Sequence, residues 1–214
     1  DTDDWRMPLI EIGEARFLSI AGRDFESYTR LNAASKMIFL NSNNVARNIH
    51  SEILSLYYYV LTTFKEKIRH LSLSLPLLMT GLNLTSISTF KLAFEYRIAT
   101  NEVKHLKMPV SHILRAVETL EKNGLMILAC IGYRTLAILS RINDDYQSAF
   151  KYYDIAIKIA TEQNLSINLK QIQNSLAFTL YTQGKSDEAE NLYSAIMVNG
   201  KFDPISPILN ENLS

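Results

Sequence analysis

The residue types that could do chemistry in this 214-residue sequence lack the spacing that catalysis or cofactor binding needs. Gly184-Lys185-Ser186 is similar to the end of a phosphate-binding loop. Such a loop has a further glycine five residues before the Gly-Lys pair, so that backbone N–H groups can surround the phosphates. Thr179 occupies that position. These residues therefore indicate a polar turn between helices.

Histidine and cysteine side chains are no better placed for metal binding or catalysis. His105 and His112 lie seven positions apart on either side of Pro109, and no third ligand is in register with them. Cys130 stands in an apolar run, which indicates a small buried residue rather than a reactive thiol. No Gly-x-Ser-x-Gly, His-Glu-x-x-His or dinucleotide-binding motif is present. We therefore expect no enzyme activity, no metal and no cofactor.

The composition excludes several classes of partner. Lysine and arginine total 22, and aspartate and glutamate total 22, so the formal net charge is zero. Proteins that bind nucleic acid normally carry a basic excess, so we expect no nucleic-acid binding by this chain. No run approaches the roughly 18 apolar residues of a membrane-spanning helix, so we expect no membrane span. One cysteine excludes an internal disulfide, which fits the cytoplasm and is also compatible with a bacterial periplasm.

The spacing of apolar residues predicts α-helix nearly everywhere. Over residues 149–160 the apolar side chains recur three and four positions apart, which places them on one stripe of a helix. No segment of useful length alternates with a period of two, so no β-structure is expected. Pro109 is expected to open a helix over Val110 to Glu121. Short polar breaks rich in Gly, Asn and Asp separate the helices at residues 21–24, 41–44, 80–83, 123–124, 143–145, 163–164 and 183–187.

Two segments of the chain repeat at an interval of 40 residues. The recurring residues are Leu136, Ala137, Ala149 and Tyr153, which return as Leu176, Ala177, Ala189 and Tyr193. A repeat of this length is typical of helical hairpins that need neighbours to cover their apolar faces.

The repeated pattern resembles the tetratricopeptide repeat. In that family, an aromatic residue, a leucine and a small residue lie in a first helix, and alanine and an aromatic residue lie in a second helix after a turn. The matching residues of the first copy are Tyr133, Leu136, Ala137, Asp145, Tyr146, Ala149, Tyr153 and Ala156. The second copy has Ile196 where a further alanine is usual, and the interval exceeds the family's length of about 34 residues.

The resemblance implies an all-α fold, in which about five antiparallel helix hairpins form a right-handed superhelix, or α-solenoid. The motif varies in clarity along the chain. Residues 1–126 are expected to form divergent hairpins, residues 127–198 two clearer repeats, and residues 199–214 the truncated start of a further helix.

In this family the first helix of each hairpin lines the concave binding face. Those positions in the clearer repeats are Arg134, Ile138, Arg141, Asn174, Phe178 and Tyr181, and in the weaker units Lys91, Glu95, Glu52 and Tyr59. Such a mixture suits an extended peptide, because asparagine can bond the peptide backbone, arginine can bind a carboxylate, and aromatic rings can cover apolar side chains. Tyr57-Tyr58-Tyr59 is expected to form a contact between hairpins, with an aromatic platform for a peptide as the alternative.

The resemblance thus implies a non-catalytic module that binds a protein or an extended peptide. Its long, divergent repeats are similar to sensory regions ahead of diguanylate cyclase or kinase domains in bacterial signalling proteins, and a soluble extracytoplasmic region is favoured over a cytoplasmic one. The alternatives are the peptide-sensing repeats of a transcription regulator, an all-helical enzyme, and a scaffold that forms a homodimer through its uncapped ends.

Overall fold

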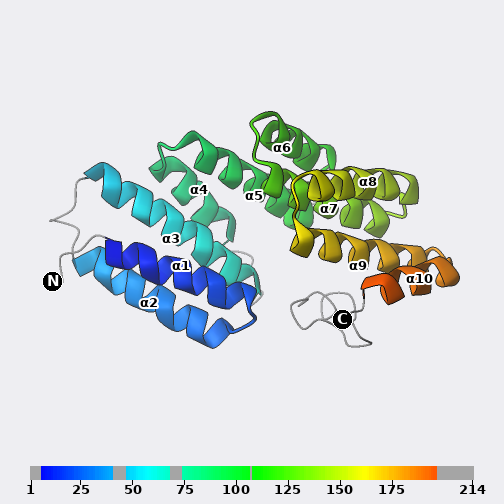
Figure 1. Cartoon of the computed structure of the whole chain (residues 1–214). Coiled ribbons are helices and arrows are strands. Elements are labelled where there is room, and N and C mark those ends of the chain that lie inside the picture. The colour runs from blue at the N-terminus through cyan, green and yellow to red at the C-terminus, as the bar shows by residue number, and fades with distance from the viewer. Residues whose placement is uncertain (1–5, 41–46, 68–73, 107, 197–214) are drawn as a thin grey trace. The chain divides into compact units, whose positions relative to one another are not determined.

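The computed structural model describes residues 6–40, 47–67, 74–106 and 108–196, and every regular element within these ranges is an α-helix (Figure 1). The expected all-α class is therefore confirmed for these residues, and consecutive helices pack together within residues 6–106 and within residues 108–196. The expected break at 41–44 and the helix expected from 199 lie outside them. The helices are α1 (Arg6–Ile20), α2 (Asp24–Leu40), α3 (Arg47–Lys67), α4 (Ser74–Leu84), α5 (Ser88–Leu106), α6 (Ser111–Lys122), α7 (Met126–Ile142), α8 (Tyr146–Glu162), α9 (Ser166–Thr182) and α10 (Ser186–Ile196).

The chain divides into two compact units. Unit 1 comprises residues 1–107 with α1 to α5, and unit 2 comprises residues 108–214 with α6 to α10. This division falls before α6, whereas the repeat motif becomes clear in the sequence only from residue 127. Helix α6 begins at Ser111, close to the helix expected after Pro109.

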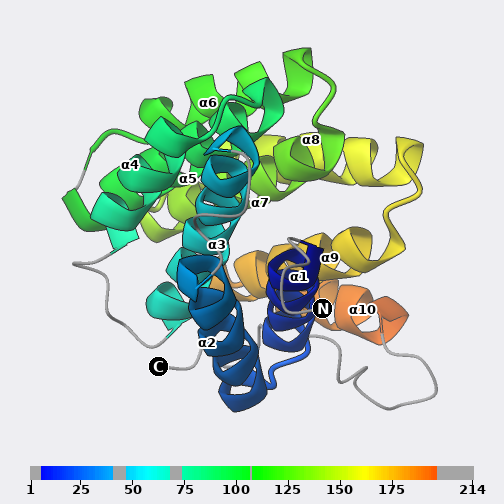
Figure 2. The same ribbon diagram turned by 90° about the vertical axis from the view of Figure 1, so that its left-hand side faces the viewer.

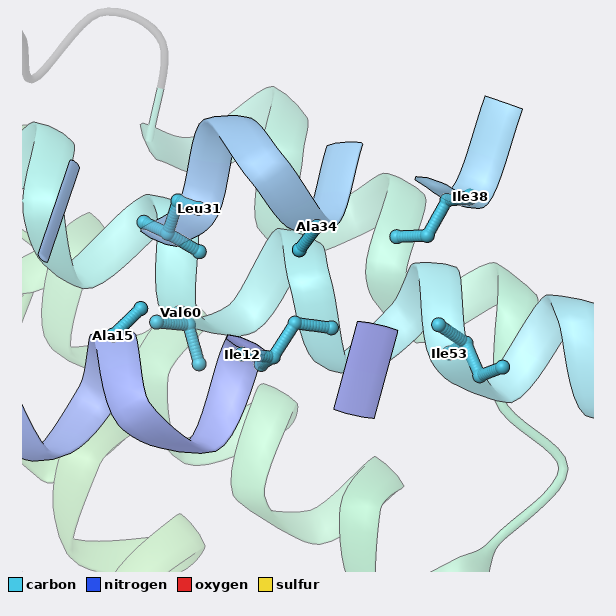
Figure 3. Packing of buried hydrophobic residues seen from close by; sticks show 7 residues of the cluster. All are labelled: Ile12, Ala15, Leu31, Ala34, Ile38, Ile53 and Val60. Atoms are coloured by element: carbon cyan, nitrogen blue, oxygen red, sulfur yellow. The ribbon is translucent and has the colours of Figure 1, made fainter. Parts of the chain in front are cut away.

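The core of unit 1 lies where α1, α2 and α3 meet. Apolar side chains from the three helices point toward one another (Figure 3), and none is more than 4% exposed. Burial of each large aliphatic side chain contributes roughly 1.5–3 kcal/mol, so this cluster is a main source of stability for the unit. Its members are Ile12, Ala15, Leu31, Ala34, Ile38, Ile53 and Val60.

One expected break is wrong, because residues 80–83 lie inside α4. A β-carbon added to Gly81 would lie 2.5 Å from Cε1 and from Cζ of the Phe94 ring on α5. The Gly81 carbonyl also accepts a hydrogen bond of 3.0 Å from the Ser55 hydroxyl on α3. The glycine therefore permits close packing of α4 against its neighbours and does not form a turn.

Unit 2 repeats one local structure every 20 residues. Helices α7, α8, α9 and α10 begin at residues 126, 146, 166 and 186, each after a three-residue connection. The middle residue of each connection has a positive φ angle, which glycine, asparagine and aspartate adopt most readily. These residues are Gly124 (74°), Asp144 (59°), Asn164 (55°) and Gly184 (85°).

Each of these connections ends the preceding helix in the same way. The N–H of the third connection residue donates to the carbonyl five residues earlier, as Leu125 does to Leu120 and Asp145 does to Ser140. This bond is characteristic of the Schellman motif, which satisfies carbonyl groups at a helix end. The breaks expected at 123–124, 143–145 and 163–164 are confirmed, and the break expected at 183–187 is confined to residues 183–185 because α10 begins at Ser186.

Small buried residues let the helices of unit 2 pack closely. Ala149 and Ala156 on α8 are fully buried, as is Cys130 on α7, whose Sγ lies 3.6 Å from the Ala156 carbonyl oxygen. Cys130 is thus the small buried residue expected from its apolar context, and burial raises the pKa of its thiol to about 11. Helices α9 and α10 also pack side by side (Figure 1, Figure 2).

Candidate binding face

Helices α7 and α9 of unit 2 lie side by side and run in the same direction. Arg134 Nη1 donates a hydrogen bond of 2.8 Å to Gln171 Oε1, and the Arg141 guanidinium carbon lies 4.8 Å from the centre of the Phe178 ring. The partners in both pairs are 37 positions apart in the sequence. An equal offset at two levels requires parallel helices in a fixed register.

Helical geometry explains why these side chains share one face. Seven residues are nearly two helical turns, so Arg134 and Arg141 lie on one side of α7, and Gln171 and Phe178 on one side of α9. We call this surface the α7–α9 face. It comprises Arg134, Ile138 and Arg141 of α7 and Gln171, Asn174, Phe178 and Tyr181 of α9.

The α7–α9 face combines buried polar atoms with exposed apolar ones. Asn174 is only 4% exposed, and its Oδ1 has no hydrogen-bond partner in the described part of the chain. The Nε atom of Arg141 is also buried and has no hydrogen-bond partner there. Ile138 and Phe178 are half-buried, whereas Tyr181 is 61% exposed. A buried polar atom without a partner costs about 1–3 kcal/mol, so these atoms have a capacity for hydrogen bonding that the fold does not use.

The charge of the two helices has one sign. Neither α7 nor α9 contains Asp or Glu, and together they carry Arg134, Arg141 and Lys170. The described helices that pack around them, α6, α8 and α10, do contain carboxylates. The α7–α9 pair is therefore a local concentration of positive charge in a chain whose net charge is zero.

Hydrogen bonds from a buried tyrosine of α8 fix the position of α9. The Tyr153 hydroxyl lies 3.2 Å from the Ser175 carbonyl oxygen, to which it donates, and 3.1 Å from Thr179 Oγ1. Tyr153 is fully buried, and burial raises the pKa of its hydroxyl. A buried side chain with two partners on the next helix fixes the register between them.

In unit 1, Glu52 is held in an internal network. Its carboxylate accepts hydrogen bonds of 2.6 Å from the Thr85 hydroxyl and from the N–H and hydroxyl of Ser86, in the connection before α5. Burial acts to raise the pKa of Glu52, but these hydrogen bonds outweigh it and hold the pKa below its usual value. Glu52 therefore supports the α4–α5 connection.

Tyr59 also makes contacts inside unit 1. Its ring meets the Phe94 ring edge-on at 5.2 Å, and the Arg97 guanidinium lies 4.8 Å from its centre. Tyr57 and Tyr58 likewise meet edge-on at 5.7 Å. Tyr59 on α3 therefore contacts two residues of α5, and its ring lies inside unit 1.

Lys91 and Glu95 are exposed and lie one turn apart on α5. They belong to unit 1, as do Glu52 and Tyr59, so the predicted binding residues are divided between the two units. The six that fall in unit 2 are those that the structure brings together on α7 and α9.

Gln171 belongs to the α7–α9 face but was not predicted from the sequence. The sequence does contain a spacing that could have identified it, because Gln171 precedes Phe178 by the same seven residues that separate Arg134 from Arg141. Three exposed isoleucines on the two helices were also missed, namely Ile127, Ile142 and Ile167.

Two further features are absent from the described residues, namely a metal-binding cluster and a membrane-spanning helix. No group of three His, Cys, Asp or Glu side chains within these ranges could hold a metal ion. None of the helices there is long and apolar enough to cross a lipid bilayer. Gly184 lies in the turn between α9 and α10, as its sequence context indicated.

Neither a model of a known protein family nor a curated protein matches this chain significantly.

Proposed function

We propose that the chain is a non-catalytic, tetratricopeptide-like binding module and that its α7–α9 face binds an extended segment of a partner protein. The observation that supports this proposal most is the parallel pair of helices in register. It places two guanidinium groups, a buried amide with an unused acceptor and an exposed tyrosine on one face. Extended peptides need this combination of backbone hydrogen bonds, charge recognition and apolar contact.

The proposal includes a right-handed superhelix of stacked hairpins. Its support is local: a 20-residue helix-and-turn unit, small buried residues in α8, and the Tyr153 hydroxyl bonded to the next helix. Stacks of this kind leave one face of successive first helices open to a ligand.

For the chain as a whole, we propose a role as the sensory or regulatory region of a bacterial signalling protein. This role follows from the resemblance of the repeats in residues 127–198 to the tetratricopeptide family. The charge and side chains of the α7–α9 face suit recognition of a peptide.

Selection from a random peptide library tests the proposed function and yields ligand peptides directly. The full chain is used as bait, and enriched peptides are measured against a variant that combines Arg134→Ala with Asn174→Ala. We expect binding to the double variant to fall at least tenfold while far-ultraviolet circular dichroism stays unchanged.

The matched control is a double variant with Lys151→Ala and Lys158→Ala, which alters exposed residues of α8. This control should bind like the original chain. Failure to enrich any peptide, or equal binding by the Arg134/Asn174 variant, would contradict the proposed function.

A further inference from the structure

We infer that the segment bound by the α7–α9 face carries large apolar side chains at positions i and i+6 and polar side chains at i+2 and i+4. This inference rests on the proposed function and adds the chemistry and the register of the partner segment. Its basis is the pair of exposed apolar side chains at each end of the face, on either side of a polar middle.

Four exposed apolar side chains lie in pairs at the two ends of α7 and α9. Ile127 (55% exposed) and Ile167 (58%) are the second residues of their helices. At the other end, Ile142 (61%) is the last residue of α7, and Tyr181 (61%) is the last but one of α9. Exposed apolar residues that gather on one surface mark a contact with a partner, whereas single scattered ones do not.

Helical spacing places these four side chains on the side of the α7–α9 face. Each lies four or seven positions from another residue of the face, and residues at these spacings share one side of a helix. The pairs are Ile127 with Arg134, Ile142 with Ile138, Ile167 with Gln171, and Tyr181 with Asn174. The offset of 37 positions between α7 and α9 brings the two residues at each end to the same level within one helical turn.

The middle of the face is mainly polar. Between the two ends lie the hydrogen bond from Arg134 to Gln171 and, one turn further along α9, the buried amide of Asn174. A leucine placed over these groups would remove them from water without offering a hydrogen bond in return, which is unfavourable. The middle of the face therefore selects polar side chains, and its ends select apolar ones.

The distance between the two ends sets the positions of the apolar residues in the segment. Ile127 and Ile142 are about 22 Å apart along α7, and Ile167 and Tyr181 are about 21 Å apart along α9, at roughly 1.5 Å per residue. Six residues of an extended chain span about 20 Å, and its side chains at i, i+2, i+4 and i+6 point to one side. Apolar residues at i and i+6 therefore reach both ends, with i+2 and i+4 over the polar middle. A separation of five or seven residues would turn one apolar side chain away from the face.

The size of the exposed surface favours a peptide segment over a second copy of this chain. A large apolar side chain has roughly 150 Å² of surface to bury, so the exposed fractions of these four correspond to roughly 350 Å². Two copies that met through this surface would bury roughly 700 Å² of it, less than the ~1,000 Å² that a specific interface between proteins needs. Two leucine side chains of one segment, in contrast, are enough to cover a surface of this size.

Four capped peptides, with serine at all other positions, test the inference by fluorescence anisotropy with the full chain. The first has leucine at i and i+6 and glutamine at i+2 and i+4, and the second has the leucines and glutamines exchanged. The third has one leucine moved from i+6 to i+5, and the fourth has serine in place of both leucines. The first should bind at least tenfold more tightly than each of the others, since one buried leucine is worth about one power of ten in affinity.

A variant at one end of the face locates the leucine contacts. Ile127→Ser combined with Ile167→Ser should weaken the first peptide about tenfold, and its advantage over the fourth peptide should shrink by the same factor. Ile10→Ser is the matched control, because it replaces an isoleucine of unit 1 that is also about half exposed. The control should leave both affinities unchanged, and far-ultraviolet circular dichroism should be the same for all three chains.

The inference and the proposed function can fail separately. Failure of the first peptide to bind, equal affinity for the four peptides, or an equal loss with Ile10→Ser would overturn the inference. A dimer, detected by sedimentation at the concentrations used and lost in the Ile127/Ile167 variant, would show that a second copy covers the face and would overturn it as well. Library peptides that depend on Arg134 and Asn174 but lack apolar residues at i and i+6 would overturn only the inference. The proposed function fails when the library yields no peptide that depends on those two residues.

Discussion

Replacing Gly81 with alanine should destabilise unit 1, although alanine is the better helix former. The added β-carbon would lie 2.5 Å from two atoms of the Phe94 ring, far inside van der Waals contact. The ring has little room to move, because Phe94 is 1% exposed and the Tyr59 ring packs against it edge-on at 5.2 Å. The clash must therefore be relieved by a shift of α4 relative to α5.

The size of the effect follows from two opposing contributions. Gly→Ala in a helix interior stabilises by roughly 0.5–1 kcal/mol, and one excess carbon in a packed core costs about 1–3 kcal/mol. We expect a net loss of about 1–2 kcal/mol in the free energy of unfolding. Gly13→Ala on α1 is the matched control, since nothing lies within 4 Å of its β-carbon position. It should be neutral or stabilise by up to about 1 kcal/mol.

Urea-induced unfolding followed by circular dichroism measures both variants, and hydrogen exchange locates the change in α4 and α5. A second background with Phe94→Leu makes space for the new carbon. Because the two residues are in direct contact, Gly81→Ala should cost at least about 1 kcal/mol less there. An unfolding free energy that rises with Gly81→Ala, or an equal cost in both backgrounds, would refute the packing explanation.

Four further outcomes are expected. Glu52→Gln should destabilise unit 1 most at neutral pH, because a carboxyl whose pKa is lowered by folding stabilises the folded state only when it is ionised. The difference in unfolding free energy between the variant and the original chain should therefore shrink as the pH falls through the folded pKa of Glu52. Urea titrations between pH 3 and 7 measure this difference, and a constant value would show that the hydrogen bonds to Glu52 are unimportant. Gly184→Ala should cost about 1 kcal/mol because φ is positive there and no atom crowds the position, and an unchanged midpoint would contradict this. Tyr153→Phe should lower the free energy of unfolding by about 1 kcal/mol, because it removes the hydrogen bond to the Ser175 carbonyl. Tyr193→Phe, at the half-buried position 40 residues later, is the control and should have little effect. Cys130 should react with iodoacetamide at pH 8 only after denaturant is added, and rapid labelling of the native chain would show that the thiol is not buried.

Much of the secondary structure was accessible from the sequence because glycine, asparagine and aspartate mark the helix ends. Gly124, Asp144, Asn164 and Gly184 each adopt the positive φ angle that their residue types favour. The 20-residue spacing of the helix starts is hard to see in the sequence, because the clearest repeated motif spans two helices and therefore recurs every 40 residues. Gly81 misled the prediction because glycine serves two purposes, and only the position of the Phe94 ring distinguishes a close approach from a turn.

The candidate binding residues were predictable only in part. The spacing of Arg134 and Arg141 is visible in the sequence, but their partners Gln171 and Phe178 depend on which helices become neighbours and in what register. Glu52 was expected on a binding face, and its hydrogen bonds to Thr85 and Ser86 involve residues more than 30 positions away. Contacts of this kind are set by tertiary packing, which local periodicity does not encode.

The most direct test of the central claim is an NMR titration of the full chain with a peptide enriched from the library. The account predicts that the largest saturable shifts occur at the side chains of Arg134, Arg141 and Asn174, with smaller shifts elsewhere on α7 and α9. The claim would be contradicted if the shifts were concentrated on exposed residues of α8, on α10 or in unit 1 while those three side chains were unaffected.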